Sequence, residues 1–220
     1  MGQINKTTLE FLNSLKHNNN REWFLKNQSL YKAAKSNFES FVQEVINEIT
    51  LFDPIIKGLE VKNCVYRINR DIRFSNDKTL YKSHLGAFIV RGGKKNGDKF
   101  AGYYFHIEPG NSMIAGGAYM PPTPWLNAIR ENISDEPDKF LKIISEKNFI
   151  KYFGQIEGEK LKSAPKGYKG DHPLIDHLKF KSYLVTSQVA DKDVLDAGFQ
   201  ALVMNVFKAM KPFNDFLSNY

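Results

Sequence analysis

Three of the six arginines in this 220-residue chain, Arg67, Arg70 and Arg73, lie within seven residues of one another. A guanidinium group binds two oxygens of a carboxylate or phosphate at once, and a rigid strand would hold several such groups in place. The chain carries 31 basic and 24 acidic residues, a formal net charge of +7, which also favours an anionic partner. We therefore predict a pocket for a phosphate or carboxylate ligand, in which Asp71 orients one of the arginines.

The residues that follow the arginines extend this candidate site. Lys78, Tyr81 and Lys82 lie in a predicted loop, where they would close over a bound anion as a lid. Lys166 and Tyr168 belong to a second polar loop, which either covers the same face of the sheet or has no role. The predicted ligand-binding residues are Arg67, Arg70, Asp71, Arg73, Asp77, Lys78, Tyr81, Lys82, Lys166 and Tyr168.

His106 and Glu108 are the candidate catalytic residues. They are two positions apart in a predicted strand, so their side chains share one face. Histidine titrates near neutral pH, and a neighbouring carboxylate can pair with it. If the protein is an enzyme, which the sequence leaves open, its chemistry would be that of a phosphate ester or a small acid. The alternative is a hydrogen-bonded histidine with a structural role only.

Two other interpretations of the arginines remain open. In the first, Arg67, Asp71, Arg73 and Asp77 pair with one another and only hold the fold together. In the second, the protein is a nucleic-acid-binding or protein-binding module whose arginines contact a phosphate backbone. Nucleic acid is not favoured, because the lysines are scattered and no run of five or more basic residues occurs.

Neither a cofactor nor a metal is expected. The sequence has no glycine-rich phosphate loop of the Walker type and no dinucleotide-binding fingerprint after a strand. The single cysteine, Cys64, excludes an intrachain disulfide and a multi-cysteine zinc site, and it suits a reducing compartment. A magnesium site formed by Asp71, Asp77 and Glu108 is a minor alternative, since nearby arginines suit a metal only together with phosphate.

The hydropathy of the chain predicts a cytoplasmic protein. No apolar run approaches the ~18 to 20 residues of a membrane helix, and the N-terminus has no unbroken apolar core of the kind a secretory signal needs. We expect no membrane partner, and the oligomeric state stays open.

Hydrophobic periodicity predicts an α+β fold, with a central antiparallel sheet, an N-terminal helical section and C-terminal helices packed against it. Residues 1–58 are predicted to be helical, including a long amphipathic helix from 21 to about 49 with one break near Gln28. Between 61 and 120 the period changes to two, which predicts strands at 61–74, 85–91, 99–108 and 112–119. Residues 121–220 are mainly helical, with one further strand at 183–189. The prediction is a single domain, 1–220.

The predicted strand at 61–74 determines what the arginines can do. Arg67, Asp71 and Arg73 would share one face, while Arg70 would point among apolar residues on the other. An unpaired guanidinium there would be costly. We therefore expect a bulge that redirects Arg70, or a carboxylate that pairs with it.

The segment from Arg67 to Lys82 resembles the signature of a known family. The chain is similar to the family described as domain of unknown function 2461 in the run Arg67-Ile68-Asn69-Arg70-Asp71-Ile72-Arg73-Phe74-Ser75, followed by Asp77-Lys78-Thr79 and Tyr81-Lys82. Further segments agree in order and spacing over residues 5–218, at 20–24, 104–109, 116–121, 165–168 and 171–173. One difference is Leu80, where the family usually has proline, which alters loop stiffness more than chemistry. The resemblance implies one compact α+β domain with a polar site, and it implies no particular activity.

Overall fold

Four antiparallel strands form one sheet, in the order β1-β2-β3-β4, in the part of the chain that this computed structural model describes, residues 2–73 and 76–218. The strands are β1 (Leu85–Ile89), β2 (Gly102–Ile107), β3 (Ser112–Ala118) and β4 (Tyr183–Val189). Four of the five predicted strands are thus confirmed. The register places Gly86 opposite His106, and Tyr104 opposite Ala115, so these four residues lie on the same face of the sheet.

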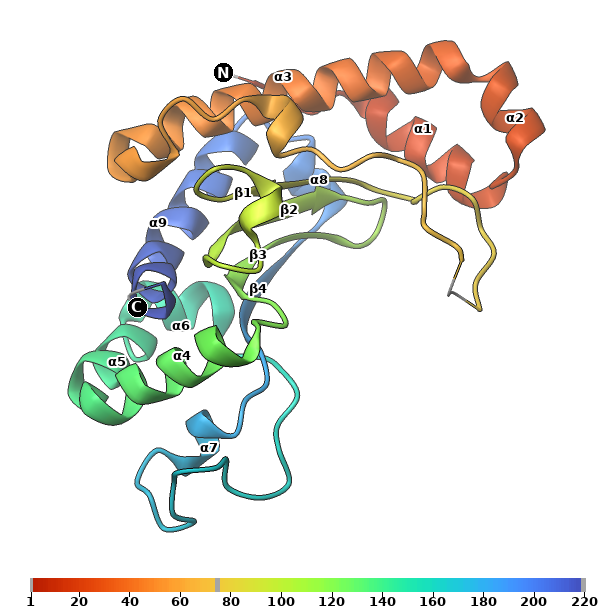
Figure 1. Cartoon of the computed structure of the whole chain (residues 1–220). Coiled ribbons are helices and arrows are strands. Elements are labelled where there is room, and N and C mark those ends of the chain that lie inside the picture. The colour runs from red at the N-terminus through yellow and green to blue at the C-terminus, as the bar shows by residue number, and fades with distance from the viewer. Residues whose placement is uncertain (1, 74–75, 219–220) are drawn as a thin grey trace.

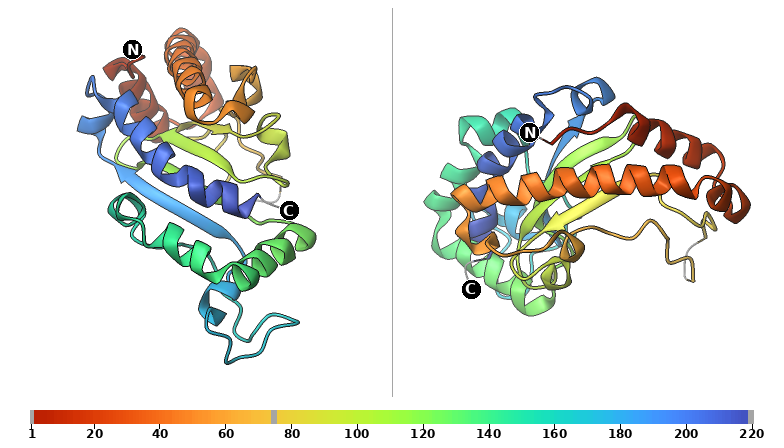
Figure 2. Two further views of the ribbon diagram at one scale, coloured as in Figure 1. Left: turned by 90° about the vertical axis from the view of Figure 1, so that its left-hand side faces the viewer. Right: turned by 90° about the horizontal axis from the view of Figure 1, so that it is seen from above.

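Helices α3 (Gln28–Phe52) and α9 (Phe199–Leu217) cover the other face (Figures 1 and 2). Alternate residues of β2 point into this layer. The ring centroid of Phe105 lies 5.5 Å from that of Phe38 in α3, and that of Tyr103 lies 5.0 Å from Phe207 in α9. Burial of these apolar surfaces stabilises the packing of both helices on the sheet.

The remaining helices confirm the predicted α+β arrangement. Asn20 caps α2, because its Oδ1 accepts the backbone N–H of Trp23 at 2.9 Å. The predicted break near Gln28 is confirmed at Asn27, where α2 ends and α3 begins. In the described ranges no helix is both long and apolar enough to cross a membrane. The helices are α1 (Lys6–His17), α2 (Arg21–Lys26), α4 (Thr123–Asp135), α5 (Pro137–Ile144), α6 (Lys147–Phe153), α7 (Ile175–Leu178) and α8 (Asp191–Val194).

The predicted strand at 61–74 is wrong. Val61–Asn63 form a 3-10 turn, and residues 64–66 then pair with β1 around an isolated bridge between Val65 and Ala87. The chain continues as an extended arm, residues 67–73 and 76–82, which we call the arginine arm. It runs away from β1 beneath α1 and α2 (Figure 1). Phe74, the last residue of the predicted strand, and Ser75, which follows it in the family signature, lie outside the described residues.

The arm leaves the sheet because its neighbouring strand ends. Tyr66 already donates its backbone N–H to Gly86, one residue from the start of β1, so the antiparallel chain reaches that end at residue 67 and runs past it at residue 68. Backbone groups that lose one partner need another. The arm pairs with itself instead: Arg70 N–H donates to Leu80 O at 3.0 Å, and Lys82 N–H to Ile68 O at 2.8 Å. The three arginines therefore do not stand on the sheet.

Candidate functional site

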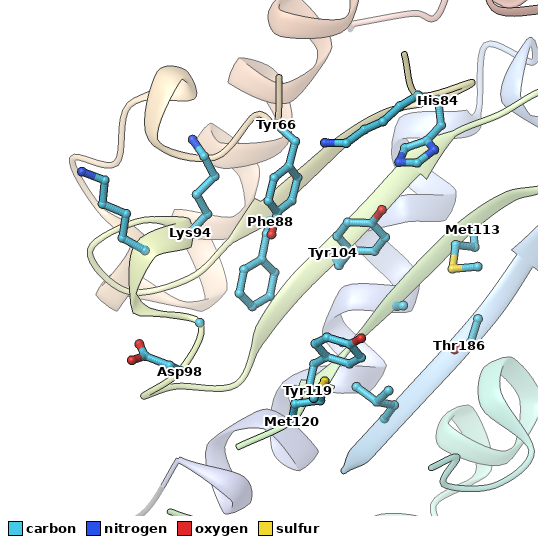
Figure 3. A pocket seen from close by; sticks show the side chains of 17 residues that line it. Tyr66, His84, Phe88, Lys94, Asp98, Tyr104, Met113, Tyr119, Met120 and Thr186 are labelled. Carbon is cyan, nitrogen blue, oxygen red and sulfur yellow. The ribbon is translucent and has the colours of Figure 1, made fainter. Parts of the chain in front are cut away.

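The sheet face opposite α3 and α9 is hollowed into a groove with a volume of about 740 Å³ (Figure 3). All four strands contribute to its floor, through Phe88, Tyr104, Met113, Ala115, Leu184 and Thr186. The segments around the sheet form its rim, through Tyr66, Lys82, His84, Lys94, Lys95, Asp98, Tyr119 and Met120. A largely apolar hollow with a few polar groups is the usual form of a small-molecule site.

Two glycines of the sheet, one lining the groove and one beside Tyr104, leave little room for a side chain. Gly117 has a φ of 107°, and a Cβ there would lie 2.0 Å from the carbonyl oxygen of Tyr183. A Cβ at Gly86 would lie 3.1 Å from the hydroxyl oxygen of Tyr104. A larger residue would have to displace the backbone of β4 at Gly117, or the Tyr104 hydroxyl at Gly86.

A polar cluster adjoins the groove at Tyr104 and His106. The Tyr104 hydroxyl lies 2.9 Å from Nδ1 of His106, and the carbonyl oxygen of Asn111 lies 2.7 Å from Nε2 of the same ring. His106 is buried, with 7% of its surface exposed, whereas Tyr104 lines the groove. Burial raises the pKa of Tyr104, so this residue is a phenol at neutral pH.

The structure brings the two predicted catalytic residues together behind Tyr104. The carboxylate of Glu108 lies 4.0 Å from Nε2 of His106, and it accepts hydrogen bonds from Ser83 and Asn111. Burial acts to raise the pKa of Glu108, but these hydrogen bonds and the nearby imidazoles outweigh it, and the net shift is downward. Glu108 is therefore a carboxylate at neutral pH.

The His84 ring lies against that of His106, with centroids 4.9 Å apart and planes inclined by 32°, and His84 lines the groove itself. Burial, together with the neighbouring His106, lowers the pKa of His84 from 6.5 to about 4, so its imidazole is uncharged at neutral pH. Across residues 2–73 and 76–218, no group of three or more histidine, cysteine, aspartate or glutamate side chains is placed to hold a metal ion. Asp71, Asp77 and Glu108, the carboxylates of the minor magnesium alternative, do not form such a group.

Lys82 is the predicted ligand-binding residue that reaches the groove. Its ammonium lies 5.2 Å from the ring centroid of Tyr66 and donates a hydrogen bond to the carbonyl oxygen of Arg67 at 2.9 Å. Burial and the positive charge of Arg67 both lower the pKa of Lys82. Lys94 and Lys95, from the 3-10 turn Lys94–Asn96, add further positive charge to the rim.

Two of the three arginines pair with carboxylates of their own arm. Arg70 contacts both Asp77 and Thr79, which answers the expected need for a carboxylate partner. Arg73 forms two parallel hydrogen bonds with Asp71, of 2.9 Å from Nε and 2.6 Å from Nη2. The pair between Arg73 and Asp71 is one that the structural interpretation of the arginines expected, whereas Asp77 pairs with Arg70, which that interpretation did not include. None of the three arginines is among the described residues that line the groove.

The other predicted members of the lid lie elsewhere. The structure places Tyr81 in the core instead of in a lid: it is 7% exposed, and its ring stacks on Phe24. Lys78 donates to the carbonyl oxygen of Ile72, within the arm, at 3.3 Å. The loop with Lys166 and Tyr168 lies beside α7, at the opposite end of the molecule from the arm (Figure 1). The structure thus brings His106 and Glu108 together and places Lys82 on the rim of the groove, bonded to Arg67. None of the other predicted ligand-binding residues is among the described residues that line the groove.

Sequence reasoning missed Tyr66, His84 and Tyr104. Tyr104 had a usable signal, because it precedes His106 by two residues in a predicted strand and must share its face. Tyr66 and His84 gave no comparable signal. They meet the groove only because the segments 64–66 and 83–84 lie along the edge of the folded sheet.

One protein-family model matches the part of the chain that forms the arginine arm, the sheet and the helices behind it. The family model described as Conserved hypothetical protein (DUF2461) matches residues 7–216, nearly the whole chain. The chain belongs to this family. The DUF2461 match covers the arginine arm, every lining residue of the groove and most of α9. Among curated proteins and among solved structures, no match to the chain was found.

Proposed function

We propose that this DUF2461 protein binds a small organic anion in the groove on the open sheet face. The ligand would have a flat apolar or aromatic body and a phosphate or carboxylate group. The composition of the lining supports this proposal. An apolar and aromatic floor lies beside three lysines, Lys82, Lys94 and Lys95. Asp98 is the one acidic residue among the described residues of the lining. Such a protein would work in the cytoplasm, the location expected from its sequence.

The lysines suit the charged end of such a ligand. The ammonium of Lys82 is partly buried and next to Arg67, so a ligand anion would relieve repulsion between two positive groups. Attraction between charges is stronger where water is partly excluded, as it is in a groove of this depth. Lysine ammonium groups bind phosphate and carboxylate as point charges and do not demand a single geometry.

The floor suits the apolar body. Phe88 and Tyr104 present aromatic rings, and Tyr66 lies edge-on to Tyr104 with ring centroids 6.4 Å apart. Aromatic ligands gain both from burial of their surface and from offset or edge-to-face contacts with such rings. An anion without an apolar body would leave this part of the groove unused.

The sequence predicted that the arginines bind the anion, whereas this proposal assigns the anion to the lysines on the rim of the groove. Arg70 and Arg73 are engaged with Asp77 and Asp71, so a ligand would have to displace those carboxylates. Arg67 keeps a supporting role, because its charge acts on Lys82.

The test is calorimetric titration and thermal shift with phenyl phosphate, benzoate, inorganic phosphate and benzyl alcohol. We expect phenyl phosphate to bind best, and Lys82→Gln to weaken it about ten-fold or more. Lys32→Gln, an exposed lysine of α3 on the far side of the sheet, is the matched control and should bind normally. Absence of binding by either aromatic anion would contradict the proposal. Binding only to RNA or DNA, lost steeply with salt, would favour the nucleic-acid alternative.

A further inference from the structure

We infer that Tyr104 presents a hydrogen-bond acceptor, and no donor, to the groove, and so selects aromatic anions that carry an N–H or O–H group. This inference rests on the proposed function, since it concerns which ligands the same groove prefers. It follows from the direction of two hydrogen bonds at His106.

The first bond fixes the proton of the imidazole. Nε2 of His106 lies 2.7 Å from the carbonyl oxygen of Asn111. A carbonyl oxygen only accepts, so Nε2 must carry the hydrogen. In the neutral ring the other nitrogen, Nδ1, then has a lone pair and no hydrogen.

The second bond fixes the proton of the phenol. The Tyr104 hydroxyl lies 2.9 Å from Nδ1, which can only accept, so the hydroxyl donates its single hydrogen to His106. Burial raises the pKa of Tyr104, which keeps that hydrogen on the phenol. The Tyr104 oxygen can then only accept a hydrogen bond from a partner in the groove.

The surroundings hold the pair in this arrangement. The His84 ring packs against His106 at a tilt of 32°, with centroids 4.9 Å apart. The backbone of β1 passes so close to the Tyr104 hydroxyl that a Cβ at Gly86 would be 3.1 Å from it. Rotation of the hydroxyl hydrogen toward the groove would leave the buried Nδ1 of His106 without a partner, which costs free energy.

The ligand class follows from these restrictions. A ligand amino or hydroxyl group near Tyr104 would donate to the oxygen and complete its hydrogen bonding. A nitro or carbonyl group at the same place would meet a lone pair and lose its hydrogen bonds to water. The preferred ligand is therefore an aromatic or similarly flat anion with a donor group on its ring.

Three probes that share a phenyl phosphate core and differ at the para position test this selection: phenyl phosphate, 4-aminophenyl phosphate and 4-nitrophenyl phosphate. They are titrated at about pH 8, where the second ionisation of a phosphate group, near about 6, is complete. We expect the amino compound to bind about five-fold or more tightly than the nitro compound, the size of one net hydrogen bond. Tyr104→Phe should remove this difference and still bind phenyl phosphate. Tyr119→Phe, at the more exposed of the two rim tyrosines, should retain it.

The outcomes separate the two proposals. Equal affinities for the three compounds in the unmodified protein would overturn the selection by Tyr104 and leave the groove as an anion site. Binding of none of them would overturn the proposed function, and this inference with it. Nitrogen-15 NMR of the His106 ring provides a check without ligand: we expect hydrogen on Nε2 only, and hydrogen on both nitrogens at about pH 8 would overturn the inference.

Discussion

The ring of Tyr81 stacks on that of Phe24, with centroids 4.0 Å apart and planes inclined by 12°. Asn19 completes this contact, because its side chain bonds both the N–H and the carbonyl oxygen of Tyr81, each at 2.9 Å. The arginine arm is thus fixed to the α1–α2 corner at the residue before Lys82. Because Lys82 lines the groove, the N-terminal helices position one wall of the candidate site.

Tyr81→Ala should destabilise the protein by about 3 kcal/mol, since it removes a large buried ring and leaves a cavity beside Phe24. Urea unfolding measures the loss. Tyr119→Ala removes an exposed ring, 67% accessible, and should change the free energy of unfolding by less than about 0.5 kcal/mol. Equal effects of the two substitutions would mean that the stacked contact does not anchor the arm.

The carboxyl of Asp77 should titrate at about pH 2, well below its ordinary value of 3.8, because Arg70 and then the backbone of Thr79 donate hydrogen bonds to it. Because the pKa of Asp77 is lower in the folded protein than in the unfolded chain, its ion pair stabilises the fold fully at pH values above the unfolded pKa. This stabilisation is lost as the pH falls through 3.8 toward about 2. Carbon-13 NMR of the carboxyl follows the titration. Arg70→Gln should return the midpoint toward 3.8, and Arg91→Gln should leave it unchanged; a midpoint near 3.8 in the unmodified protein would rule out the pair.

His84 should make the protein less stable in mild acid. Its pKa is about 4 in the folded state and 6.5 as an ordinary value, so between these pH values the unfolded chain binds a proton that the folded protein excludes. Stability should therefore fall as the pH drops from about 6.5 to about 4, by up to ~1.4 kcal/mol per pH unit. Urea unfolding at a series of pH values tests this. His84→Gln should flatten the curve, whereas His17→Gln, at the exposed end of α1, should not; the same slope in both variants would disprove the assignment.

Gly86→Ala should disturb the Tyr104–His106 pair directly, since the new methyl group would lie 3.1 Å from the tyrosine oxygen. We expect a loss of about 1–3 kcal/mol in stability from overpacking, and a changed nitrogen-15 signal of His106. Gly170→Ala is the control, because nothing lies within 4 Å of a Cβ there. An unchanged His106 signal in Gly86→Ala would show that the hydroxyl has more room than the structure gives it.

The hydrophobic pattern of the sequence predicted secondary structure correctly where a segment has a clear period of its own. The alternation of Tyr103 and Phe105 with Tyr104 and His106 defines the two faces of β2 before any neighbour is known. The break between α2 and α3 was likewise predictable, since the apolar spacing weakens near Gln28. Helices and strands of this kind are predictable because their hydrophobic period is present in the local sequence.

The arginine segment shows where local pattern is insufficient. Residues 61–74 alternate like a strand, yet a strand forms only beside a partner, and the chain runs past the first residue of β1, Leu85, directly after Arg67. Whether Arg70 meets a ligand or Asp77 depends on the turn of the arm, which no period in the sequence encodes.

The sequence by itself determined the α+β class, four of the five predicted strands, the family and the shared face of His106 and Glu108. The tertiary structure decided which sheet face stays open and which residues line it. Lys82, His84 and Tyr104 meet there because the arm is anchored at Tyr81 and because α3 and α9 occupy the opposite face. Hydrophobic burial fixes the covered face of a sheet, but the groups gathered on the open one depend on contacts between segments distant in the chain.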